Sequence, residues 1–186
     1  MRDLAKSVRS LSKKLVLLLL LVPLCALGQA LEHEVKAAYL FRFLSFVEWP
    51  PSSFLRPDSP IVIGVLGDEA VLEELRGIVP GRVVQGRPVA AVRIPLDARP
   101  GASLAGVHVL FVARAASAQL AQLAPTRGIL VVSDSERGLD QGAVVNFVRA
   151  EGRLRFEVAV DAAEQRELRI SSRMLAVASS VRPGKL

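Results

Sequence analysis

The chain has 186 residues, of which 51% are hydrophobic and 23% are charged, with a formal net charge of +6 at pH 7. This length suits one domain with a substantial core, and the apolar content excludes a disordered protein. Residues 1–28 hold five basic residues and one acid, so the charge of the remainder is 6 − 4 = +2. No dense basic face is left to neutralise phosphates, which argues against nucleic-acid binding.

Residues 1–28 have the pattern of a secretory signal peptide. A basic opening precedes an apolar run from Leu15 to Leu27, and small residues follow in CALGQA. The run is about 13 residues long, whereas a membrane span needs about 20, so an uncleaved anchor is the weaker alternative. Cleavage fits after Gly28 or after Ala30. We expect a signal peptide over 1–28 and an exported domain over 29–186 that is not inserted in the membrane.

The only cysteine, Cys25, lies in this leader. The exported domain therefore has no disulfide and no thiol chemistry.

Helices and strands alternate along most of the remaining chain. Residues 34–48 lack Gly and Pro and predict a helix that Pro50 closes. PIVIGVLGD predicts a buried strand, EAVLEELRGI a helix, and RVV and PVAAVRI two short strands around a QGRP turn. GVHVLFVA predicts a further buried strand, and AASAQLAQLA a helix.

The last third of the chain changes character. ILVVSD predicts a third buried strand, AVVNFVRAEGRLRFEVAV a β-hairpin around Glu151-Gly152, and residues 172–181 a final helix. Continuous apolar strands alternating with helices indicate a mostly parallel sheet that is covered on both faces. The expected fold is therefore α/β: a single three-layer Rossmann-like domain with a mostly parallel sheet, a C-terminal antiparallel hairpin and a final helix.

The sequence offers little evidence of catalysis. GVLGD lacks the spacing of a nucleotide-binding loop, and we interpret it as a tight turn in which Asp68 caps the next helix. His33 and His108 are far apart in sequence, and His108 lies in a buried strand, so we predict a core histidine and no metal site. No nucleophile elbow is present and the carboxylates are scattered. We expect no enzyme activity and no cofactor, although an exported hydrolase remains an alternative.

LRISSRML is the one candidate for a small ligand. Ser171 or Ser172 suits the N-cap of the final helix, where free N–H groups favour anions. Arg169 and Arg173 bracket this point and are candidate ligands for an anion. An ordinary capped helix with two surface arginines is the simpler interpretation.

Five of the nine aromatic residues lie between Val35 and Pro50. On a helical projection most of the circumference is apolar, and Phe41, Leu44 and Trp49 share one shoulder. Either this helix is wedged between the sheet and the final helix, or the shoulder stays exposed and docks a partner.

Five blocks in the same order resemble the YfiR family: EVKAAYLFRFLSFVEWP, PIVIGVLGD, VHVLFVA, LVVSD and AVVNFVRAEGRLRFEVAVDAAEQRELRISSRML. The resemblance implies a periplasmic protein that restrains a membrane-bound diguanylate cyclase through the cyclase's periplasmic sensor domain, lowering cyclic di-GMP and biofilm formation. It implies no catalysis. The contact surface expected from it combines the aromatic shoulder with the final helix, and its candidates are Phe41, Leu44, Trp49, Ile170, Met174 and Leu175.

The chain departs from family members that sense redox state through cysteines, because its exported part has none. Regulation would then need a small anionic ligand, a partner or a change in abundance. A ligand-binding module that is not coupled to a cyclase is the alternative function, and the sequence leaves a homodimer open.

Overall fold

The computed structural model describes residues 31–99, 102–123 and 126–184. The expected signal peptide, with Cys25, lies outside the described residues. In the described part no helix is long and apolar enough to cross a membrane.

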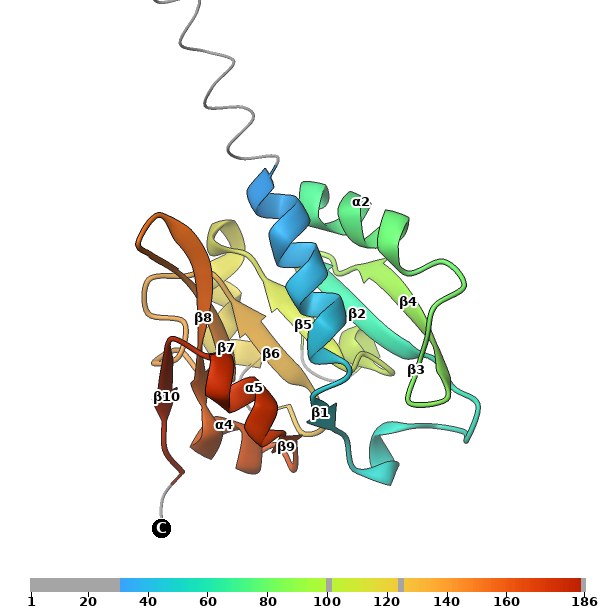
Figure 1. The fold of residues 1–186 in the computed structure, drawn as a ribbon. Coiled ribbons are helices and arrows are strands. Elements are labelled where there is room, and N and C mark those ends of the chain that lie inside the picture. The colour runs from blue at the N-terminus through green and yellow to red at the C-terminus, as the bar shows by residue number, and fades with distance from the viewer. Residues whose placement is uncertain (1–30, 100–101, 124–125, 185–186) are drawn as a thin grey trace, which may run out of the picture.

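An eight-stranded mixed sheet forms the centre of the domain, in the order β10-β8-β7-β6-β5-β2-β4-β3 (Figure 1). Its strands are β2 (Ile61–Leu66), β3 (Val83–Val84), β4 (Arg87–Arg93), β5 (Val109–Val112), β6 (Leu130–Ser133), β7 (Val145–Ala150), β8 (Arg153–Ala159) and β10 (Ser180–Arg182). The five strands from β4 to β7 run parallel, while β8 is antiparallel to β7 and β3 to β4. This is the predicted α/β, Rossmann-like arrangement.

The chain starts its sheet at β2, turns to one side for β4, and returns to the other side for β5. The order therefore switches between β2 and β5, and doubly wound sheets place polar ligands and catalytic groups beyond the strand ends at such a point.

Helices cover both faces of the sheet. They are an N-terminal helix (31–43), α2 (Glu69–Ile78), α3 (Leu120–Leu123), α4 (Val160–Glu164) and α5 (Ser172–Val177), with 3₁₀ turns η1 (Pro51–Ser53), η2 (Ala102–Leu104) and η3 (Arg114–Gln119). Alternate strand residues face opposite layers, as the period of a strand requires. Val109 and Phe111 pack with the N-terminal helix, α2 and α5, whereas Leu110 and Val112 pack with η3 and α3.

The predicted helix over 34–48 ends earlier than expected. It is helical from residue 31, where the described chain begins, to 43, and a turn over 44–46 follows. Val47–Glu48 form β1, which pairs antiparallel with β9 (Arg169–Ile170). The side chain of Gln85 supports this break, because its Nε2 donates to the carbonyl oxygens of Leu44 (2.8 Å) and Val47 (2.9 Å).

Two other helices differ from the prediction. The final helix ends at Val177 rather than 181, because residues 180–182 form β10 and pair with β8 in parallel. The AASAQLAQLA segment is mostly 3₁₀ and has only one α-helical turn, α3. The predicted hairpin is confirmed, and its two turn residues, Glu151 and Gly152, have φ of 53° and 72°.

Candidate functional site

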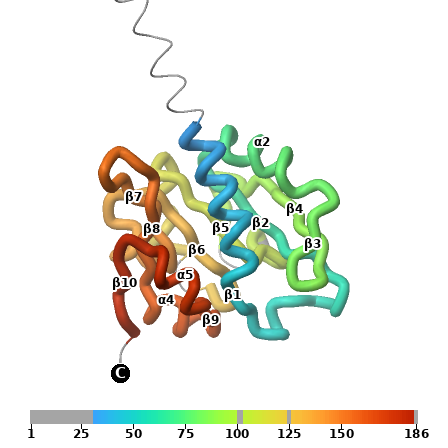
Figure 2. Tube along the Cα trace, viewed as in Figure 1, coloured from blue at the N-terminus to red at the C-terminus, as the bar shows by residue number. Residues whose placement is uncertain are grey.

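The β1–β9 pair forms a corner where the first and last parts of the domain meet (Figure 2). Val47 lies opposite Ile170, and Glu48 lies opposite Arg169. The N–H of Ser171 donates to the carbonyl of Phe46 at 2.8 Å, which extends the contact by one bond. Backbone pairing therefore brings the two segments of the expected contact surface together.

The six candidate contact residues divide into two groups. Leu44 and Met174 are fully buried, and Trp49 is 8% exposed. Phe41, Ile170 and Leu175 are partly exposed and pack on the same core. In this conformation the first three support the surface from beneath, and only the second three offer area to a partner.

Trp49 does not lie on the helical shoulder that the projection gave it. The helix ends at residue 43, so the chain turns Trp49 inward. Its Nε1 donates to the carbonyl of His108 at 3.1 Å, and its ring meets the imidazole edge to face. A buried Trp with a satisfied N–H is a core residue.

Tyr39 and Phe43 show why aromatic residues are concentrated in the N-terminal helix. Tyr39 and Phe43 stack on each other, with ring centroids 5.9 Å apart. Phe43 also contacts Phe156 edge to face, with ring centroids 5.1 Å apart, and stacks on Phe147 at 6.1 Å. The helix thus packs its rings on the β7–β8 hairpin, which confirms its predicted role in the core.

Arg169 and Arg173 are both exposed, one on β9 and one on α5. Ser171 is the N-cap of α5, as one of the two predicted alternatives had it, and its Oγ accepts from the N–H of Met174. The cap oxygen is therefore used by its own helix. Binding of an anion between the two arginines stays a prediction.

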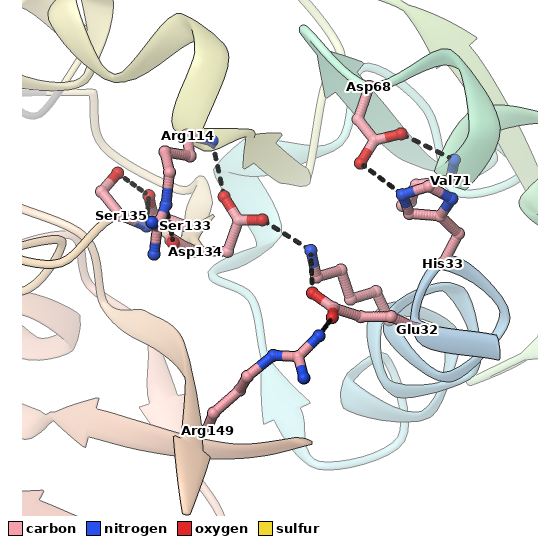
Figure 3. Close-up of polar contacts among 10 residues, drawn as sticks. Glu32, His33, Asp68, Val71, Arg114, Ser133, Asp134, Ser135 and Arg149 are labelled. Carbon is pink, nitrogen blue, oxygen red and sulfur yellow. Dashed lines mark hydrogen bonds and ion pairs between the residues drawn. The ribbon is translucent and has the colours of Figure 1, made fainter. Parts of the chain in front are cut away.

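A polar cluster at the carboxyl edge of the sheet was not found from the sequence (Figure 3). Lys36, on the N-terminal helix, is 4% exposed. Its Nζ lies 2.6 Å from Asp134 Oδ2, just beyond β6, and 2.9 Å from Glu32 Oε1. Glu32 also pairs with Arg149 of β7. We call Glu32, Lys36, Asp134 and Arg149 the edge network.

Neighbouring groups extend this arrangement along the same edge. Asp68, which follows β2, accepts from the N–H of Val71 at 3.1 Å and so caps α2 as predicted. Its other oxygen lies 3.8 Å from His33 Nε2. Beyond β5, the backbone N–H of Arg114 donates to Asp134 Oδ1 at 2.5 Å. Both Asp134 oxygens are thus engaged within the protein.

The charges of the edge network stabilise one another. Burial alone would lower the pKa of Lys36, but hydrogen bonds and charges from Asp134 and Glu32 outweigh it and raise that pKa above 10.5. Burial would raise the pKa of Glu32, yet Lys36 and Arg149 hold it below 4.5. Lys36 is therefore a protonated ammonium at neutral pH. It cannot serve as a nucleophile or a base there, so the network suits anchoring the helix rather than catalysis.

His108 is buried, as predicted, at 2% exposure. Its Nδ1 accepts from the N–H of Val62 at 3.2 Å, and Phe54 stacks on its ring at 4.5 Å. Arg87 Cζ lies 3.7 Å from the centroid of the Phe54 ring. Within the described residues Nε2 has no hydrogen-bond partner, and those residues hold no group of three or more His, Cys, Asp or Glu that could bind a metal.

Fold and site together define a Rossmann-like α/β domain whose strand-edge charges are paired internally. The chain belongs to the YfiR/HmsC-like family, because the model of that family matches residues 33–179. No curated protein matches the chain closely enough to count as a relative.

Proposed function

We propose that this protein is a periplasmic inhibitory binding protein. It restrains a membrane-bound diguanylate cyclase by binding the cyclase's periplasmic sensor domain, which lowers cyclic di-GMP and biofilm formation. Membership of the YfiR/HmsC-like family is the observation that carries this proposal. The charge pairing of the edge network supports a regulatory rather than a catalytic role.

The β1–β9 corner is the surface that we assign to the partner. Phe41, Phe46, Ile170 and Leu175 are partly exposed there and rest on the core, and Val177 of α5 is 63% exposed. Aromatic and aliphatic anchors of this kind contribute most to protein–protein contacts. Restraint then means that the protein binds the inactive state of the cyclase more tightly than the active one.

Cyclic di-GMP in the source cell tests the function. Deleting the gene should raise cyclic di-GMP, and only a gene that retains residues 1–28 should restore the low level. An unchanged level on deletion under several growth conditions would refute the cyclase role. Restoration by a gene without residues 1–28 would refute the periplasmic location.

A matched pair of variants tests the surface. Val177→Asp puts a charge on α5, whereas Leu55→Asp puts the same charge on an 89% exposed residue of the loop after η1. We expect Val177→Asp to raise cyclic di-GMP as deletion does, and Leu55→Asp to behave as wild type. Equal behaviour of the two folded variants would exclude α5 from the contact.

A further inference from the structure

A small polar pocket lies beyond the ends of β5 and β6, separate from the corner described above. It has a volume of about 210 Å³, and its lining residues are Arg114, Ser117, Ser135, Glu136, Arg137 and Gln141. Arg114 comes two residues after β5, and Ser135 two residues after β6. Adjacent parallel strands thus open onto the pocket at their carboxyl ends, next to the β2–β5 switch point and on the sheet edge that doubly wound folds use for ligands.

Positive charge dominates this pocket. Its lining holds two arginines, Arg114 and Arg137, and one carboxylate, that of Glu136. The Arg114–Glu136 pair is 3.5 Å long and its side chains are 65% and 84% exposed, so it is a weak surface pair. No ion pair of Arg137 occurs within the part of the chain that the structure describes.

The two other carboxylates of this loop, Asp134 and Asp140, are each paired with a cation, and Arg182 Nη2 lies 3.0 Å from Asp140 Oδ1. Asp134 directs Oδ2 to Lys36 and Oδ1 to the N–H of Arg114 (Figure 3). Its charge is compensated by the buried ammonium group. An anion in the pocket therefore meets a net positive field.

Hydroxyl donors are also available. The Oγ of Ser133 accepts from the N–H of Ser135 at 3.1 Å, and the two Oγ atoms lie 2.7 Å apart. Because Ser133 Oγ already accepts one hydrogen bond, its hydroxyl can donate to Ser135 Oγ. The hydroxyl hydrogen of Ser135 is then available to a ligand. Ser117 and the side-chain amide of Gln141 line the same pocket.

We propose that this pocket binds a small oxyanion, the carboxylate or phosphate group of a small metabolite. Guanidinium groups recognise both through charge-assisted hydrogen bonds. The volume is below the roughly 300 Å³ at which drug-sized ligand pockets begin, so the pocket itself suits a single small anionic group. The proposal does not rest on the proposed function, because the pocket shares no residue with the β1–β9 corner.

Titrations followed by ¹⁵N NMR test the site, with inorganic phosphate in one arm and acetate in the other at constant ionic strength. In the wild-type protein the amide signals of Ser117, Ser135 and Gln141 should shift and saturate. The arm that saturates at lower concentration identifies the preferred oxyanion.

Charge variants distinguish specific binding of the anion in this pocket from a nonspecific effect of the added anions on the spectra. Arg114→Ala and Arg137→Ala should each weaken binding about tenfold, the effect of one charge-assisted hydrogen bond. Glu136→Gln should tighten it, because the competing carboxylate is removed. Arg127→Ala is the matched control, since it removes an arginine that is 80% exposed and paired with Glu167 outside the pocket. Shifts that grow linearly with anion concentration, or that are equal in all four variants, would overturn the proposal.

Discussion

Lys36 and Asp134 form a 2.6 Å ion pair although 98 positions separate them in the sequence. The pair ties the N-terminal helix to the end of β6, at the edge where a doubly wound sheet more often places its ligand. Because the lysine is almost fully buried, its charge depends on this partner.

Replacing Lys36 should therefore lower the free energy of unfolding. Lys36→Ala leaves the partly buried Asp134 without its cation, and we expect a loss of about 3 kcal/mol in the free energy of unfolding. Arg149→Ala removes the exposed member of the edge network and should cost less than about 1 kcal/mol. Urea denaturation of both variants measures the difference. Equal losses would show that burial does not set the strength of these pairs.

The same network predicts a loss of stability in acid. The folded pKa of Glu32 is lowered, so its contribution is present above about pH 4.5 and disappears as the pH falls through the folded value. The folded pKa of Lys36 is raised, so its contribution is complete below pH 10.5 and is lost only as the pH rises further. As the pH is lowered from 7 to 3, the free energy of unfolding should fall less steeply in Lys36→Ala than in wild type. An unchanged slope would contradict this linkage.

His108 predicts a second pH effect. Burial lowers its pKa below 6.5, and the charge of Arg87 acts in the same direction. The unfolded chain then takes up the proton more readily, so stability is lost as the pH falls below about 6.5. His108→Asn keeps an acceptor for Val62 but does not titrate. Its urea midpoint should be lower overall and should change less between pH 7 and 5; a slope equal to wild type would exclude His108 as the cause.

Gln85 has a positive φ, and its side chain forms two hydrogen bonds to the backbone of another segment. Its φ is 52°, and its amide donates to two carbonyl groups at the end of the N-terminal helix. Gln85→Ala should lose about 1–2 kcal/mol, because two hydrogen bonds are removed while the strained φ remains. Gln85→Gly should lose less, since glycine adopts this φ without strain. Thermal unfolding compares the two, and a larger loss in the glycine variant would show that the positive φ of residue 85 is not strained.

The β7–β8 turn offers a stabilising change. Glu151 and Gly152 both have positive φ, as a type I′ turn requires, and Asn-Gly is the preferred pair in such turns. Glu151→Asn should raise the unfolding free energy by up to about 1 kcal/mol, because asparagine tolerates positive φ better than glutamate. A melting temperature at or below that of wild type would contradict this account.

Most strands could be predicted because they are apolar runs bounded by turn residues. The runs at Ile61–Leu66, Leu130–Ser133 and Val145–Ala150 show this. The strands Val47–Glu48 and Arg169–Ile170 have no such pattern, since they exist only through pairing with each other across a long stretch of sequence. That pairing ended the predicted helix early and turned Trp49 into the core.

The candidate site was less predictable for a related reason. The sequence marks Asp68 and Asp134 as residues that follow buried strands, but nothing local indicates that a lysine on the first helix reaches one of them. Burial of Lys36 depends on how the N-terminal helix lies on the sheet. A projection of the helix alone could not determine it.

The dependence of the N-terminal helix on late segments affects the order in which the domain folds. Its rings pack on Phe147 and Phe156, and the segment after it is paired with Arg169–Ile170, so these partners lie more than 100 residues later in the chain. Until then the part of its apolar face that lies on the β7–β8 hairpin is uncovered, although Val109 and Phe111 of β5 can already pack with the helix. Domains with such distant contacts fold slowly and expose sticky intermediates. We therefore expect the aromatic face of this helix to be covered only late in folding, once β7, β8 and β9 have formed.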